Sequence, residues 1–209
     1  MNLDFSVIQN QKNLLAFSAG VDSSALFFLL LEQNIPFDIA IVNYNLRVQS
    51  KDEVFYAKNL ASKYKKNIFL KETKIENISN FEKNARDIRY KFFDEIILEN
   101  SYENLITAHQ LNDKLEWFMM QLSKGAGLVE LIGFNEFEQK ENHKIYKPLL
   151  NITKEELENY LKINNHKYFV DQSNFDEKYK RNYFRHTFSN KFLENFSSGV
   201  KKSFEYLQI

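Results

Sequence analysis

The stretch LLAFSAGVDS, residues 14–23, joins an apolar run to a loop of small and hydroxylated residues, and a helical pattern follows from Ser23. This order predicts a buried strand, a tight loop and the first turn of a helix. Backbone N–H groups and a helix N-terminus converge at such a junction, which favours a phosphate ligand. Gly20, one of only five glycines in the chain, allows a phosphate to approach the backbone closely. The alternative is that Asp22 and Ser23 do no more than cap the helix.

Apolar runs and helical patterns alternate beyond this junction. Strand-like runs occupy residues 14–17, 37–42, 67–70 and 105–108, and helical patterns occupy residues 23–32, 51–65, 80–98 and 112–122. The alternation predicts an α/β fold, a doubly wound parallel sheet of about five strands with helices on both faces. Ligands bind outside the carboxyl ends of the strands in such sheets, so the loops after the first, second and fourth runs are expected to converge.

The pattern changes after residue 133, where the core fold is expected to close. A polar stretch, residues 136–144, is followed by a helix expected from Thr153 to Asn164, whose start carries a capping-box signature. We therefore expect a first domain over residues 1–135 and a short, mostly helical C-terminal extension over residues 136–209.

The composition excludes several classes of protein. The chain has 209 residues, 44% of them hydrophobic, no cysteine and a formal net charge of zero. The lack of cysteine excludes disulfides, thiolate catalysis and cysteine-held metal or iron–sulfur sites. No apolar run approaches the roughly 20 residues that span a bilayer, which predicts a cytoplasmic protein with no membrane partner. Two basic stretches, residues 58–74 and 178–202, are either solvated faces or surfaces that follow a phosphate backbone. The oligomeric state stays open between monomer and homodimer.

A second constellation, His109, Asp113 and Glu116, follows the fourth strand-like run. The spacing of i, i+4 and i+7 places these side chains on one stripe of a helix. An imidazole and two carboxylates at that position can hold Mg²⁺, bind an ammonium group or accept a proton. The alternative is a capped helix start, with Asp113 paired to Lys114 or to another surface base.

Two arginines, Arg86 and Arg89, share one face of the helix expected at residues 80–98. Arg89 and the adjacent Tyr90 can contact phosphates or the planes of bases. The alternative is a surface arginine pair bonded to Glu82.

These segments resemble the motifs of one family. The loop at residues 18–23 resembles the SGGxDS loop of the ATP pyrophosphatase (PP-loop) superfamily, with Ala19 in place of a glycine. Residues 42–50 resemble VNHGLRxxS with Tyr44 for His and Asn45 for Gly, residues 80–90 resemble NxE...ARxxRY, and residues 107–117 resemble TAHxxxDxxET with Trp117 for Thr. The RGAGL motif resembles residues 124–128, and the RPLL motif resembles residues 147–150. The DxSN...RNxxR pair resembles residues 171–174 and 181–185. In this order, from about Leu14 to His186, the chain resembles the tRNA(Ile)-lysidine synthetase family, in a short form that lacks the full C-terminal domains.

The resemblance implies a ligase that acts in two steps on the tRNA(Ile) with a CAU anticodon. ATP adenylates the C2 carbonyl oxygen of the first anticodon cytidine and releases pyrophosphate. The ε-amine of free L-lysine then attacks C2 and releases AMP, which leaves lysidine. ATP is thus a substrate, and Mg²⁺ is the expected metal ion.

The resemblance also implies roles for individual residues. ATP binding is expected of Ser18, Ala19, Gly20, Val21, Asp22 and Ser23. Catalysis is expected of Asp22, His109, Asp113 and Glu116, with Asp22 and Asp113 as the metal ligands. Lysine binding is expected of Asp113, Glu116 and Arg185. Binding of tRNA is expected of Arg47, Arg86, Arg89, Lys124, Arg181 and Arg185.

Two other functions stay open. A tRNA-base thiolase of the same superfamily would adenylate a base and then deliver sulfur, but such enzymes rely on cysteines, which this chain lacks. A tRNA-binding homologue without catalysis would explain the departures from the motifs at Ala19, Tyr44 and Trp117. The intact carboxylates Asp22, Asp113 and Glu116 favour an active enzyme.

Overall fold

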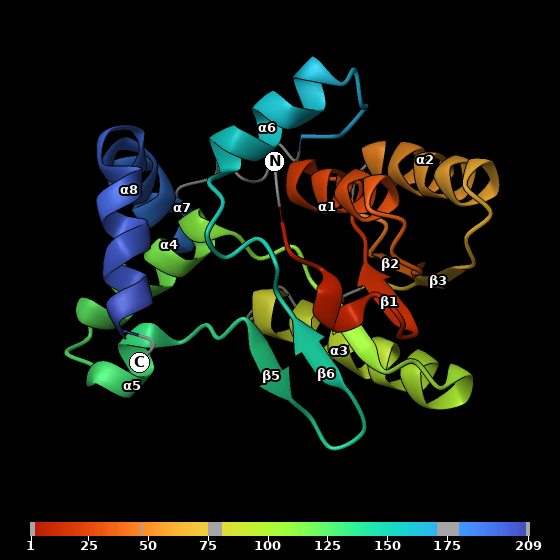
Figure 1. Cartoon of the computed structure of the whole chain (residues 1–209), viewed down its shortest axis with the longest axis horizontal. Helices are drawn as coiled ribbons and strands as arrows, with labels where there is room; N and C mark the ends of the chain where they lie inside the picture. The colour runs from red at the N-terminus through yellow and green to blue at the C-terminus, as the bar shows by residue number, and fades with distance from the viewer. Residues whose placement is uncertain (1–2, 47, 75–80, 171–179, 208–209) are drawn as a thin grey trace.

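The computed structural model describes residues 3–46, 48–74, 81–170 and 180–207. Its centre is a six-stranded sheet in the order β3-β2-β1-β4-β6-β5 (Figure 1). The strands are β1 (Asn13–Ala16), β2 (Asp38–Asn43), β3 (Ile68–Glu72), β4 (Asn104–Ile106), β5 (Phe137–Gln139) and β6 (Lys144–Tyr146). The first four confirm the expected strands to within two residues at each end.

The sheet does not close at residue 133, and that expectation was wrong. Strand β6 pairs in parallel with β4, and β5 pairs with β6 as the antiparallel edge strand. Only Ile145 and Tyr146 of β6 are apolar and buried, a pair too short to produce a strand pattern. The polar residues around them are tolerated because β5 is the edge strand and β6 lies next to it. The sheet therefore draws on both predicted segments, and their division at residue 135 stays a prediction.

Helices cover both faces of the sheet, as predicted. They are α1 (Val21–Glu32), α2 (Gln49–Lys63), α3 (Phe81–Asn100), α4 (Leu111–Leu122), α5 (Leu128–Ile132), α6 (Lys154–Ile163), α7 (Lys180–Phe184) and α8 (Asn190–Leu207), with a 3-10 turn at Ser6–Ile8 and a π-helical turn at Arg185–Ser189. Figure 1 shows α1, α2 and α6 on one side of the sheet and α3 on the other. Within the described residues, none of the helices has the length and apolar character required to cross a membrane.

Successive strand residues enter different cores, which explains why the strands read as continuous apolar runs. Leu15 of β1 packs in the larger core with α1, α2 and α6, whereas its neighbour Leu14 packs in the smaller core with α3. Ile106 and Leu105 of β4 divide in the same way. Because helices cover both faces of the parallel sheet, a ligand can reach the sheet mainly at the ends of its strands.

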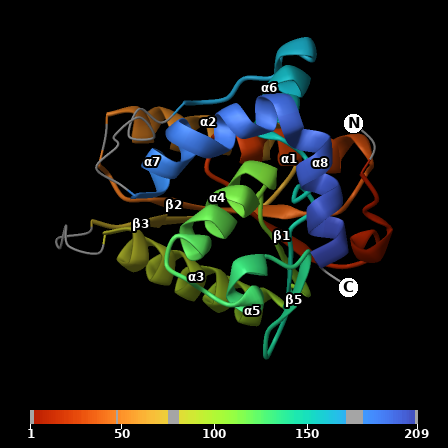
Figure 2. The same cartoon turned by 90° about the vertical axis from the view of Figure 1, so that its left-hand side faces the viewer.

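A third cluster joins the C-terminal helix to α4. Leu111 and Leu115 of α4 pack against Leu193, Val200 and Phe204 of α8. Figure 2 shows α7 and the first part of α8, both blue, lying across the green α4. This packing holds α7 beside the first turn of α4, at the carboxyl ends of the strands.

Candidate active site

The loop after β1 is held by its own serines. The backbone N–H of Ser18 donates to Ser23 Oγ at 3.1 Å, and the two serine Oγ atoms lie 3.0 Å apart. Gly20 is the N-cap of α1, so the N–H groups of the first helical turn have no partner inside the helix. Ala19 O accepts a hydrogen bond of 2.9 Å from Phe169 N, which fastens the loop to a distant segment. The loop thus presents free donors at a rigid helix start, as phosphate binding requires.

The backbone angle at Ala19 is left-handed, with φ of 60°. An L-residue pays about 1–2 kcal/mol for this conformation, which glycine adopts freely. Gly20 by contrast has φ of −74°, and a Cβ built there would meet only Ser18 Oγ, at an ordinary 3.4 Å. The strained position of the loop is therefore Ala19, whereas the packing of the chain would allow a side chain at Gly20.

Asp22, in the first turn of α1, carries a buried carboxylate oxygen. Within the described part of the chain, its Oδ1 accepts no hydrogen bond. Burial raises the pKa of Asp22 to about 7, and the charge of Asp113 adds to this effect, while Lys154 and Arg185 oppose it. A buried oxygen without a partner, close to a second carboxylate, suits a cation.

The first turn of α4 places Asp113 in two roles. It closes a capping box, since Gln110 N donates to Asp113 Oδ2 at 3.1 Å and Asn112 N donates to the side chain of Gln110 at 2.5 Å. The other oxygen, Oδ1, pairs with Arg181. The alternative of a capped helix start with a paired Asp113 is thus correct in part, but the partner is not Lys114, whose Nζ lies 4.5 Å over the ring of Phe204.

Two arginines from the end of the chain meet the carboxylates of α4. Arg185 donates from Nε to Glu116 Oε1 at 2.8 Å and from Nη2 to Oε2 at 3.1 Å. Arg181 Nε donates to Glu116 Oε2 at 2.9 Å, and its Nη2 reaches Asp113. Glu116 is fully buried, and the two guanidiniums satisfy its carboxylate oxygens there. Burial works to raise the pKa of Asp113, but Arg181, His109 and Arg185 together hold it below its usual value.

His109 lies at the same edge, ahead of α4. Its Nδ1 is 2.9 Å from Thr107 Oγ1, and its ring packs against Phe134. Burial lowers the pKa of His109 to about 4; the charge of Asp113 opposes this shift, and those of Arg181, Lys147 and Arg86 add to it. The imidazole is therefore neutral at pH 7.

The structure thus brings together Asp22, His109, Asp113, Glu116, Arg181 and Arg185 at one edge of the sheet. Arg86 and Arg89 are exposed on α3, and the charge of Arg86 reaches His109. Lys124 lies elsewhere, because it follows the far end of α4, about 15 Å of helix away from the site. Arg47, the side chain of Glu82 and residues 171–174 lie outside what the structure describes, so the predictions on them stay predictions.

Ala19, Tyr44 and Trp117, which depart from the motifs, differ in the contacts that they make. Tyr44 donates from its hydroxyl to Ala85 O at 2.8 Å, which ties the end of β2 to α3. Trp117 donates from Nε1 to Glu130 O at 2.8 Å, and a Cβ at Gly133 would lie only 2.0 Å from that nitrogen. Tyr44 and Trp117 are therefore built into the packing. Asn45, which replaces a motif glycine, is left-handed like Ala19, with φ of 53°, but asparagine tolerates this conformation better than alanine does.

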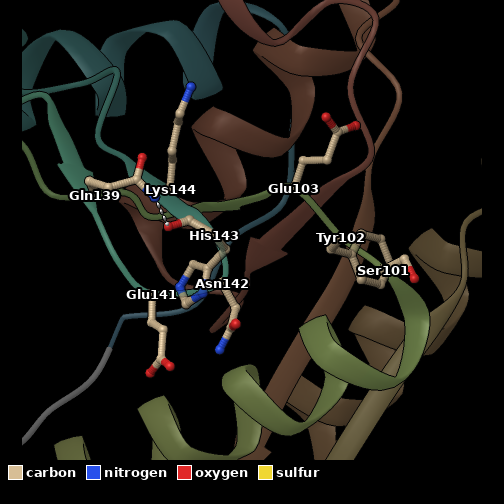
Figure 3. A pocket seen from close by; sticks show the side chains of 8 residues that line it. All are labelled: Ser101, Tyr102, Glu103, Gln139, Glu141, Asn142, His143 and Lys144. Carbon is tan, nitrogen blue, oxygen red and sulfur yellow. Dashed lines mark hydrogen bonds between the residues drawn. The ribbon is translucent and has the colours of Figure 1, made fainter.

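A hollow elsewhere on the molecule does not belong to this site. Figure 3 shows it between residues 101–103 and the turn of the β5–β6 hairpin, residues 139–144. Residues 101–103 immediately precede β4, so the hollow lies at the amino ends of the strands. The carboxylates and the phosphate loop lie at the opposite edge.

A mostly parallel sheet, with a loop of small residues at a helix start after β1 and charged side chains after β4 at the same edge, defines an α/β domain of the kind that binds ligands at the carboxyl ends of its strands. The chain matches the PP-loop domain over residues 3–192 and belongs to that family. It is 51% identical over 203 residues to the tRNA(Ile)-lysidine synthase of Campylobacter jejuni (strain RM1221), covering 97% of this chain and 63% of that protein. It is 50% identical to the enzyme of the same name from Helicobacter hepaticus, covering 98% of this chain and 49% of that protein. The chain thus spans less than two thirds of the length of these relatives.

Solved structures share the fold. The U34-tRNA thiolase NcsA from Methanococcus maripaludis, solved with its [4Fe-4S] cluster, superposes with a TM-score of 0.76 and 20% identity, covering 98% of this chain and 74% of that one. The NH3-dependent NAD synthetase of Campylobacter jejuni superposes with a TM-score of 0.50 and 16% identity, covering 96% of this chain and 86% of that one. At these identities the comparison establishes the architecture alone.

Proposed function

We propose that the protein ligates L-lysine to C2 of the first anticodon cytidine of the tRNA(Ile) with a CAU anticodon. The identity to proteins named tRNA(Ile)-lysidine synthase supports this substrate pair. The observation that carries the proposal is the convergence of a phosphate loop, Ser18 to Ser23, with the carboxylates Asp113 and Glu116. The product is lysidine, which changes the codon read from AUG to AUA. A tRNA substrate also favours action in the cytoplasm.

The first step is adenylation. The C2 oxygen of cytidine bonds to the α-phosphorus of ATP, the bond to the β-phosphate oxygen breaks, and pyrophosphate leaves with the electron pair. The N–H groups at the start of α1 and the hydroxyls of Ser18 and Ser23 would hold the leaving group, where negative charge develops.

Mg²⁺ is proposed to bind with ATP, held by Asp22 and Asp113. The oxygen of Asp22 that lacks a hydrogen-bond partner supports this fit. Among the residues that the structure describes, no group of three His, Cys, Asp or Glu side chains is placed for a metal ion, and Mg²⁺ typically takes one or two carboxylates plus substrate phosphates. When bound, the ion would neutralise phosphate charge.

The second step needs an uncharged ε-amine. Free lysine, with a pKa of about 10.4, is deprotonated to roughly one part in 10³ at pH 7, so the site must accept a proton. Asp113 and Glu116 are proposed to bind the amine and Arg185 the carboxylate of lysine. Each carboxylate already meets a guanidinium, so the incoming ammonium has to share or replace those contacts. His109 is neutral and can accept a proton, but its pKa of about 4 makes it a weak base.

The tRNA is proposed to approach across α3 and α7, where the exposed Arg86 and Arg89 face solvent near the site. Arg181 lies at the same opening, with about a third of its side chain exposed (38%). Arg47 and Lys124 stay predicted contacts. Whether one copy or two bind the tRNA is open.

A thiolase is the other candidate, since NcsA shares the fold. It is not favoured here, because the chain has no cysteine to carry sulfur or a cluster.

The test is direct. Purified protein is incubated with ATP, L-lysine and the tRNA, and the nucleosides are analysed by mass spectrometry, where lysidine is expected. Omission of lysine should allow pyrophosphate release without lysidine, which separates the two steps. Absence of lysidine with an intact, folded protein would contradict the proposal.

A further inference from the structure

Helices α1, α4 and α7 begin at the candidate active site and contribute residues predicted from the motifs, whereas a fourth helix that begins there contributes none. Asp22 lies in the first turn of α1, and Asp113 lies in the first turn of α4. The fourth helix is α6, whose first residue is Lys154. Lys154 lies more than 130 positions after Asp22, outside every motif considered above.

The backbone places the start of α6 beside the start of α4. Leu111 N donates to Ile152 O at 2.9 Å, and Lys154 N donates to Asn112 Oδ1 at 3.1 Å. Thr153 caps α6 through a capping box with Glu156, so this first turn is well defined. The backbone of Lys154 is therefore anchored to Asn112, the residue that precedes Asp113.

The same helix packs along α1. Leu157, Tyr160 and Leu161 of α6 belong to the core that contains most of α1. The hydroxyl of Tyr160 donates to Glu32 at the far end of α1 at 2.5 Å. Two fixed neighbours, α4 and α1, thus direct the start of α6 toward the phosphate loop.

The charge of Lys154 acts on this loop, and no ion pair among the described residues neutralises it. The ammonium of Lys154 lies close enough to Asp22, in the first turn of α1, for the two charges to interact. Within the described residues, its side chain, which is half-buried, has no hydrogen bond or ion pair. Other lysines near it are paired, as Lys162 with Glu158 and Lys201 with Glu156. An ammonium held near a phosphate loop, with its donors unused, suits an anion.

We propose that Lys154 binds the β- and γ-phosphates of ATP and the pyrophosphate that leaves in the adenylation step. As the bond from the α-phosphorus to the bridging oxygen breaks, the electron pair stays on pyrophosphate. The ammonium of Lys154 stabilises that charge and transfers no proton. The inference rests on the proposed adenylation chemistry, but its ligand, pyrophosphate, can be tested alone.

The test measures pyrophosphate binding to the full chain in the presence of Mg²⁺ by calorimetry. Lys154→Ala is expected to weaken binding on the order of 10- to 100-fold, since hydrogen bonds to charged groups are lost. Lys154→Arg should restore most of the affinity, which a purely structural role would not predict. Lys162→Ala is the matched control on the same helix, because its side chain is 61% exposed, and it should bind as the unchanged protein does.

A second measurement follows pyrophosphate release with tRNA but without lysine. Lys154→Ala should raise the KM for ATP and lower the rate of release, while lysine KM, measured in the complete reaction, stays the same. Equal pyrophosphate affinity in Lys154→Ala and unchanged protein would overturn the inference. If unchanged protein makes no lysidine but Lys154→Ala still loses pyrophosphate affinity, the proposed function fails and the phosphate site stands.

Discussion

The loop after β1 and the helices of the C-terminal segment build the same site in opposite ways. The loop acts through neighbours in sequence, since Ser18, Gly20 and Ser23 bond to one another and to the start of α1. The C-terminal helices act at long range, since Arg181 and Arg185 reach carboxylates 65 to 69 positions earlier in the chain. The backbone donors for phosphate are therefore local, whereas the balance of charge around the carboxylates depends on tertiary packing.

The largest expected effect comes from removing one charge where the two regions meet. Asp113→Asn keeps the shape of the capping side chain but removes the charge proposed to bind the lysine amine. Lysidine formation should fall by at least about 100-fold, as when one preorganised group at a reacting centre is lost. Because the phosphate loop is built locally, ATP affinity measured by calorimetry without Mg²⁺ should stay within a few-fold. Undiminished lysidine synthesis would place the lysine site elsewhere.

The next change removes a long-range contact of the C-terminal helices and leaves the phosphate loop as it is. Glu116→Gln removes the fully buried charge that faces two guanidiniums. Arg181 is partly solvated, so most of the loss comes from Arg185, and unfolding in urea should show a destabilisation of about 3 kcal/mol. Glu158→Gln, in an exposed pair on α6, is the control and should change stability by less than about 0.5 kcal/mol. Equal effects of the two changes would mean that the arginine cluster adds no stability.

The pH dependence of stability tests the surroundings of Asp22, which lies next to the phosphate loop and interacts with the charges of Asp113 and Arg185. Its pKa in the folded protein is raised from 3.8 to about 7, so the folded state binds more protons than the unfolded state between these values. Stability of the ligand-free protein should therefore fall as pH rises from about 4 to 7, by up to about 1.4 kcal/mol per pH unit from this group. Asp22→Asn should flatten this fall, measured by thermal unfolding across the range. A profile with the same slope in both proteins would assign the dependence to other groups.

The smallest expected effect lies inside the local region. Ala19→Gly relieves a left-handed alanine, a gain of about 1–2 kcal/mol, offset by the greater freedom of glycine in the unfolded chain, about 0.4–1 kcal/mol. A net stabilisation of about 0.5 kcal/mol is expected in urea unfolding. Ala25→Gly, inside α1, is the matched control and should destabilise by about 1 kcal/mol. Loss of stability in both variants would mean that the loop does not strain Ala19.

Much of the fold was predictable because its elements follow local rules. The apolar runs of β1 to β4 and the capping box at Thr153 each depend on residues close together in sequence. Strand β6 was missed because two buried residues, Ile145 and Tyr146, make no pattern until β4 lies beside them. Because Ala19 occupies a glycine position of the motif, the sequence suggests that its backbone angle φ is unusual. Only the structure gives the value of that angle.

The sequence by itself determined the alternating α/β architecture, the phosphate loop and the stripe of His109, Asp113 and Glu116, because periodicity and turn chemistry operate over a few residues. The tertiary structure decided which charges meet. It placed Arg181 and Arg185 on those carboxylates and brought Lys154 to the phosphate loop. Coulomb interactions depend on distance in space, and α6, α7 and α8 acquire those distances only when they pack on α1 and α4.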